Sequence, residues 1–155
     1  MSLAVALLPA PRKADAAARH DRVERSIVRK FNKIRAAHGL PRLHSSRALA
    51  RSADYHSSDM LRGNFFAHPS SNGDSMLRRV TTFRPARRVG EVLAWIPTTS
   101  GRGQAGRVVR MWMASAPHRA SLLTASFTRV GVARRRGTFA GQTATVFTAD
   151  FSSAR

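Results

Sequence analysis

The sequence predicts an α+β domain in which helices pack on a small antiparallel sheet. Apolar residues in the first half recur every three or four positions, as they do along one face of a helix. The last quarter alternates apolar and polar residues, which is typical of strands joined in a hairpin. The chain has 155 residues and no internal repeat, so we expect one folded domain at 21–155, preceded by a separate segment at 1–20.

The first predicted helix has apolar positions spaced by four, four and three residues, which are Val23, Ile27, Phe31 and Ile34. Asp21 is the expected N-cap, and Gly39 ends the helix. The second helix begins near Ser45 and Ser46 and ends at Gly63, and its apolar line includes His56, which we interpret as a half-buried packing residue rather than a ligand.

The remaining elements follow from apolar runs and turn residues. A short helix is expected around 76–80, then a basic loop at 81–88, a buried strand at 89–96 and a turn at 97–103. A fourth helix passes through Trp112, and Pro117 ends it or starts a short helical turn that carries His118. Strands at 127–136 and 143–151, joined by a loop at 137–141, complete the predicted hairpin.

The N-terminal segment is typical of secretion. Residues 3–11 are apolar, and Ala14, Asp15 and Ala16 resemble a signal-peptide cleavage site, so we interpret residues 1–20 as a leader or the remnant of one. The sequence holds no run that approaches the roughly 18 apolar residues of a transmembrane helix. We therefore expect a secreted or cell-surface protein.

The charge balance predicts anionic partners. The chain has 27 Lys and Arg against 8 Asp and Glu, which gives a net charge of +19. Such a chain is expected to meet an anionic surface, an acidic lipid or a cell-wall polymer. Nucleic acid is not an expected partner, because no aromatic residues alternate with the arginines. The predicted basic surface consists of Arg78, Arg79, Arg84, Arg87 and Arg88, with a second run at 134–136.

Three residues stand out as candidates for a functional site, namely His68, Glu91 and His118. Each lies in its own apolar or aromatic segment, at intervals of 23 and 27 residues, so only the fold can bring them together. Glu91 stands between a glycine and an apolar run, where its carboxylate should be buried and should need an imidazole or a cation as its partner. The chain contains no cysteine, which excludes disulfides and thiolate metal sites.

The order of motifs resembles the CAP superfamily, in particular the bacterial SCP-like domains. The resemblance runs from about Val23 to Phe151. It rests on six stretches, which are RAAHGLPRL at 35–43, ADYHSSDM at 53–60, FFAHP at 65–69, GEVLAW at 90–95, WMASAPHRASLL at 112–123 and FTRVGVA at 127–133. It implies an α-β-α sandwich, usually secreted, with an open cleft lined by two histidines and one or two acidic residues.

Carried over to this sequence, the cleft residues are His68, Glu91 and His118. Members with the full set have a second glutamate where this chain has Ser115, and an asparagine where it has Val92. The resemblance implies a monomeric binding module for a lipid, a cell-wall polymer or a protein partner, rather than an enzyme. The alternative is a metal-dependent hydrolase, in which His68, Glu91 and His118 hold a divalent cation such as Zn²⁺ and carry the catalysis. The same three residues could instead form a hydrogen-bond network that orders the cleft.

Overall fold

The computed structural model describes residues 13–98 and 103–154, with side chains from residue 22 onward. The helices are α1 (Lys13–Ala37), α2 (Arg47–Gly63), α3 (Met76–Phe83), α4 (Gln104–Ala114) and α5 (Ala116–Leu122). The strands are β1 (His44–Ser45), β2 (Val89–Pro97), β3 (Arg129–Phe139) and β4 (Gln142–Ser152). The predicted α+β class is confirmed.

The four strands form one sheet in the order β1-β3-β4-β2. The hairpin of β3 and β4 is antiparallel over its whole length, and β2 pairs antiparallel with β4 on the other side. The two-residue β1, which the sequence did not predict, lies parallel to the start of β3 and makes the sheet mixed.

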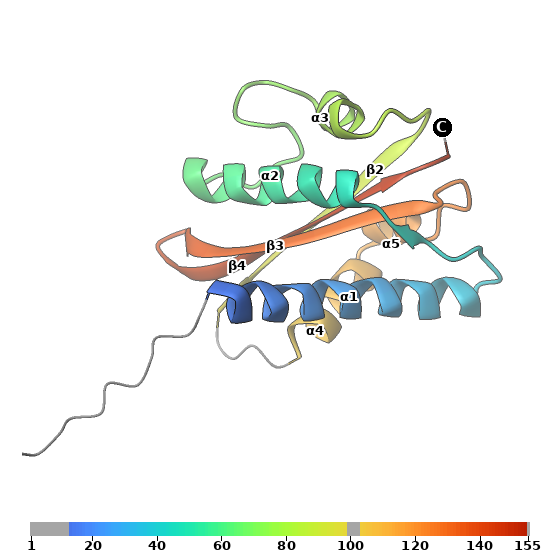
Figure 1. Ribbon diagram of the computed structural model, residues 1–155, viewed down its shortest axis with the longest axis horizontal. Helices are drawn as coiled ribbons and strands as arrows, with labels where there is room; N and C mark the ends of the chain where they lie inside the picture. Colours follow the sequence, from blue (N-terminus) through green and yellow to red (C-terminus); the bar gives the residue numbers. More distant parts are fainter. Residues whose placement is uncertain (1–12, 99–102, 155) are drawn as a thin grey trace, which may run out of the picture.

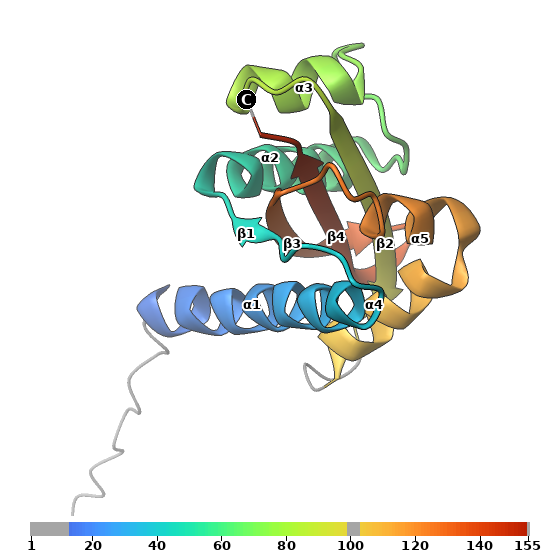
Figure 2. The same ribbon diagram turned by 90° about the vertical axis from the view of Figure 1, so that its right-hand side faces the viewer.

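Helices cover both faces of the sheet, so the α-β-α sandwich that the resemblance implied is confirmed (Figure 1 and Figure 2). The face shown uppermost carries α2 and α3, whereas α1 and α4 lie across the opposite face, with α5 beside β2. The larger apolar core lies between the sheet and α1 and α4, where Phe31, Trp112 and Phe147 are fully buried. The indole Nε1 of Trp112 donates a hydrogen bond to Leu93 O at 2.8 Å, so its polar group is satisfied inside this core.

The contact between α2 and the sheet depends on a glycine in β3. A Cβ atom built on Gly131 would lie 2.0 Å from the backbone nitrogen of Ala50, a separation at which the helix would have to move. The missing side chain therefore lets α2 pack directly on β3. This close approach brings α2 near the buried polar residues of β2 and β4.

Several predicted boundaries differ from the observed ones. Helix α1 begins at Lys13 rather than after Asp21, so the prediction of Asp21 as its N-cap is wrong. The loop predicted at 137–141 is a tight turn at Ala140 and Gly141, both with positive φ, and residues 137–139 extend β3 because they stay paired with β4. The predicted basic loop starts later, because α3 continues to Phe83.

The proposed division at residue 20 stays a prediction. Residues 1–12 lie outside the described residues, and the segment 13–20 belongs to α1. None of the helices in the described ranges is long and apolar enough to cross a membrane.

Candidate functional site

Glu91 is at the centre of a group of polar residues between β2 and the helices α2 and α3. The register pairs it with Asp150 on β4, and its side chain is completely buried. Its neighbours Gly90 and Val92 point to the opposite face, where Val92 belongs to the apolar core. The alternation of the strand therefore turns this carboxylate away from the main core and toward α2 and α3.

Both carboxylate oxygens of Glu91 have a partner. The imidazole of His68 lies with Nδ1 at 2.8 Å from Oε1, and the guanidinium of Arg79 on α3 forms an ion pair with Oε2. Arg79 also donates to His68 O at 2.8 Å and to Ser70 Oγ at 2.9 Å. One buried arginine therefore neutralises Glu91 and also fixes the loop that carries His68.

This environment keeps Glu91 ionised. Burial raises the pKa of its carboxyl group, but the hydrogen bond with His68 and the charge of Arg79 outweigh burial, so the pKa lies below its ordinary value. A carboxylate in this state is a strong hydrogen-bond acceptor and a weak base.

Asp150 lies in the opposite electrostatic state. Complete burial and then the negative charge of the facing Glu91 raise the pKa of Asp150 well above its ordinary value. Its two oxygens and the buried hydroxyl of the neighbouring Ser52 do not complete hydrogen bonds of standard geometry. The pKa values of the two facing carboxyl groups thus move in opposite directions, as is expected when like charges cannot both be buried.

His56 belongs to this cluster, contrary to its interpretation as a half-buried packing residue. Its side chain is fully buried, and its Nε2 lies 2.8 Å from Ala67 O and 3.9 Å from Glu91 Oε1. Burial lowers the pKa of His56 more than the charge of Glu91 raises it, which favours the neutral imidazole.

The three residues predicted from the sequence occupy different positions relative to the surface. Glu91 is buried, His68 is 51% exposed, and His118 on α5 is partly buried. Burial, followed by the charge of His68, lowers the pKa of His118, which indicates that these two imidazoles are neighbours. Glu91 and His68 are thus joined by a hydrogen bond, and His118 interacts with His68 through charge.

The metal centre predicted at His68, Glu91 and His118 stays a prediction. Within residues 22–98 and 103–154, no three His, Asp or Glu side chains converge to hold a metal ion. Arg79, which pairs with Glu91, would repel a divalent cation at this carboxylate. In its present geometry Glu91 orients an imidazole, which is the position of a carboxylate outside a ligand shell.

Arg79 and Asp150 are the site residues that sequence reasoning missed. Arg79 was assigned to a basic surface, and this is wrong because its side chain is only 2% exposed. The sequence feature that could have indicated its burial is its position three residues after Met76 and next to Val80, which places it on the inward face of α3. Asp150 shares the two-residue alternation of Val146 and Thr148, which places all three on the same buried face of β4.

Comparison with known proteins gives one family. Residues 28–151 match the CAP family, described as the cysteine-rich secretory protein family, although this chain has no cysteine. The chain is 32% identical over 110 residues to "Uncharacterized protein YkwD" of Bacillus subtilis (strain 168), an alignment that covers 70% of this chain and 41% of that protein. This chain thus corresponds to less than half of that relative.

Solved structures share the fold. An extracellular protein of Bacillus anthracis that contains an SCP domain superposes with a TM-score of 0.74 at 24% identity, over 94% of this chain and 45% of that one. An outer surface protein of Borrelia burgdorferi gives a TM-score of 0.71 at 17% identity, over 86% of this chain and 94% of that one. These neighbours are extracellular or outer-surface proteins.

Proposed function

The chain belongs to the cysteine-rich secretory protein family, and we propose that it is an extracellular binding module whose ligand meets the exposed imidazole of His68. The ligand class that we propose carries phosphate groups, as acidic lipids and anionic cell-wall polymers do. The proposal adds a class of ligand to the family assignment.

The observation on which the proposal depends is that each carboxylate oxygen of Glu91 has its own partner. One oxygen bonds His68 Nδ1 and the other bonds Arg79, which in turn bonds the backbone oxygen of His68. The ring and its backbone are both tied to buried groups, while half of the side chain faces solvent. An exposed group held in this way loses little conformational entropy when it binds a ligand.

The overall charge supports an anionic ligand. A net charge of +19 on 155 residues attracts polyanions, and the attraction weakens with salt because the Debye length is about 10 Å at 0.1 M. Arg119, the residue after His118, is exposed and adds a cation to α5. His68 would then supply a fixed polar contact within a broader electrostatic attraction.

A metal-dependent hydrolase is the second candidate, and one observation favours it. The lowered pKa of His118 leaves a neutral imidazole near His68, and neutral imidazoles are good ligands for Zn²⁺. Against it, Glu91 has a lowered pKa and both its oxygens are occupied, so it is a poor general base. We therefore favour binding over hydrolysis.

The test is the binding of the wild-type domain and of His68→Ala to two phosphate-bearing probes, phosphatidylglycerol vesicles and poly(glycerol phosphate). We expect His68→Ala to bind at least one probe about tenfold more weakly, the loss of one charge-assisted hydrogen bond. His38→Ala is the matched control, because His38 is an exposed histidine at the end of α1. Equal binding by the two variants would refute the role of His68, and stoichiometric zinc that is lost in His68→Ala would favour the hydrolase.

A further inference from the structure

The outer edge of β3 lacks a neighbouring strand over most of its length. The two residues of β1 pair only with Arg129 and Val130, and within the described ranges no other strand lies beside residues 131–139 on that side. In Figure 1 this part of β3 runs between α2 and α1. In the described part of the chain, residues 131–139 therefore form a strand edge without a partner strand, with α1 and α2 on opposite faces of the sheet.

The backbone direction along this edge follows from two hydrogen bonds. Val130 O accepts from Ser46 N, and Arg134 N donates to Glu24 Oε1 at 3.1 Å, so even-numbered residues turn their backbone groups outward. By the same alternation, the N–H and C=O groups of Val132, Arg136 and Thr138 point outward as well. The bond to Glu24 shows that a carboxylate oxygen fits against this edge.

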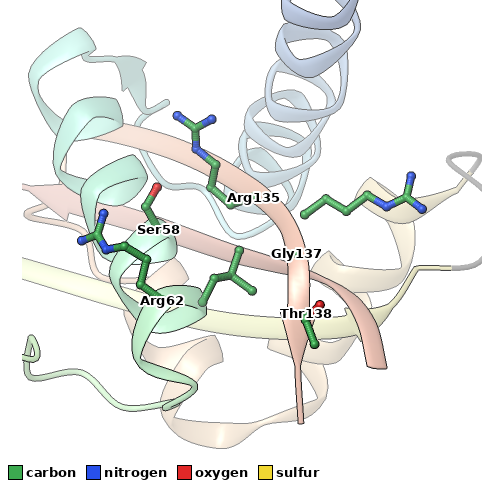
Figure 3. Close-up of a pocket in the computed structure, with 7 residues that line it drawn as sticks. Ser58, Arg62, Arg135, Gly137 and Thr138 are labelled. Atoms are coloured by element: carbon green, nitrogen blue, oxygen red, sulfur yellow. The ribbon is translucent and has the colours of Figure 1, made fainter. Parts of the chain in front are cut away.

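Two grooves lie along this edge. One, of about 350 Å³, lies where β3 passes the start of α2 and is lined by Ser46, Ala50 and Gly131. The other, of about 400 Å³, lies between the C-terminal half of α2 and residues 135–138. Figure 3 shows this second groove, with Ser58 and Arg62 projecting from α2 and Arg135 from β3.

The charge of both grooves is positive. Glu24 is the one carboxylate among their lining residues, and the lining cations are Arg25, Arg47, Arg62, Arg135 and Arg136. Arg135 forms an ion pair with Asp54 at 2.6 Å, and Arg62 one with Asp59 at 3.5 Å. The side chains of Arg135 and Arg62 are 46% and 66% exposed, so an incoming carboxylate can reach either guanidinium group.

We propose that the β3 edge is a docking site for an extended acidic peptide segment of a partner protein, which adds as a further strand along residues 135–138, where β3 is exposed or half-exposed. A peptide strand supplies the alternating donors and acceptors that the edge requires, and acidic side chains on it match the arginines. A phosphate polymer matches the charge but has no complementary backbone. This inference goes beyond the proposed function, because it uses no residue of the His68 site.

The test uses a fluorescent, terminally blocked peptide of alternating Glu and Val, about as long as 131–139. A second peptide of the same sequence carries N-methyl groups on alternate amides, which removes backbone donors and keeps every charge. We expect the methylated peptide to bind about tenfold more weakly. In NMR spectra of the wild-type domain, the unmodified peptide should slow the hydrogen exchange of the amides of Arg136 and Thr138.

Variants separate backbone from charge. Arg136→Pro removes an outward N–H that takes no part in the ladder with β4, a substitution that edge strands tolerate. We expect it to weaken binding about tenfold beyond Arg136→Ala, which removes only the side chain. Lys33→Ala, which removes an exposed cation of α1, should bind as the wild type does.

Equal affinity for the two peptides, without amide protection, would overturn the proposal and leave attraction by charge alone. The same conclusion would follow if folded Arg136→Pro bound as well as Arg136→Ala. If Arg136→Pro did not fold, as judged by circular dichroism, the comparison of the two peptides on the wild-type domain would still decide the question.

Discussion

Replacement of Arg79 by methionine should destabilise the domain more than any change to a surface arginine. The substitution keeps a long apolar stem and removes the guanidinium that forms the ion pair with Glu91. The two side chains are 2% and 0% exposed, so the change leaves a buried carboxylate without its main cation. Removing one partner of such a buried pair costs about 3–5 kcal/mol.

The assay is equilibrium unfolding in urea at neutral pH, with thermal unfolding as a second readout. A loss of this size corresponds to a fall in Tm of about 6–20 °C, taking about 2–4 °C per kcal/mol for a domain of this length. Arg78→Met is the matched control, because Arg78 is the adjacent residue of α3 and pairs with Asp74 at 3.0 Å with its side chain 77% exposed. We expect the control to lose less than about 1 kcal/mol.

A double variant makes the reasoning more specific. In Arg79→Met combined with Glu91→Gln, the carboxylate charge disappears with the cation, so the combined loss should fall short of the sum of the single losses by about 1–3 kcal/mol. Strict additivity would mean that the two side chains do not depend on each other. A loss below about 1 kcal/mol for Arg79→Met alone would refute the view of Arg79 as the buried partner that holds the site.

Three further predictions concern acidity, packing and salt. Because the pKa of Asp150 is raised, this carboxyl group holds its proton in the folded protein at pH values above 3.8, where the unfolded chain has lost it. The contribution of Asp150 to stability therefore falls as pH rises. The pKa of Glu91 is lowered, so its contribution has the opposite sign and is lost on acidification. Asp150→Asn should therefore gain stability relative to the wild type between acid and neutral pH, as measured by urea unfolding across that range, and a constant difference would contradict it. Gly131→Ala should lower the free energy of unfolding by about 1–3 kcal/mol, because its Cβ meets the backbone of α2. Gly137→Ala should lower it less, because its Cβ meets only the side chain of Leu61 at 3.2 Å. Equal losses for the two variants in unfolding experiments would contradict this packing argument. Binding to phosphatidylglycerol vesicles, followed by sedimentation, should fall steeply as salt rises, and binding that is indifferent to salt would exclude charge as its source.

The sequence was informative where one residue pattern determines one structure. Apolar spacing located the helices, and alternation located the hairpin, because both patterns follow from backbone geometry. The apolar flanks of Glu91 correctly indicated a buried carboxylate with an imidazole partner, which is His68. These inferences depend on local periodicity and on the energetic cost of burying a charge.

The partners of Glu91 were harder to identify, because they depend on which segments the fold brings together. Arg79 stands in an arginine-rich stretch, where a buried arginine and an exposed one have the same neighbours in sequence. Asp150 faces Glu91 only through the register of β2 and β4, which no local pattern specifies. The parallel β1 is two residues long and has no pattern of its own.

The most direct test of the account is an NMR titration that follows the imidazole signals of the histidines. The probe is a short-chain phosphatidylglycerol below its micelle concentration, added to the wild-type domain at low salt. The account predicts that the ring signals of His68 shift in a saturable manner and those of the exposed His38 do not. Shifts in His38 as large as those in His68, or a His68 ring that does not respond while the probe binds, would contradict the claim that the ligand meets His68.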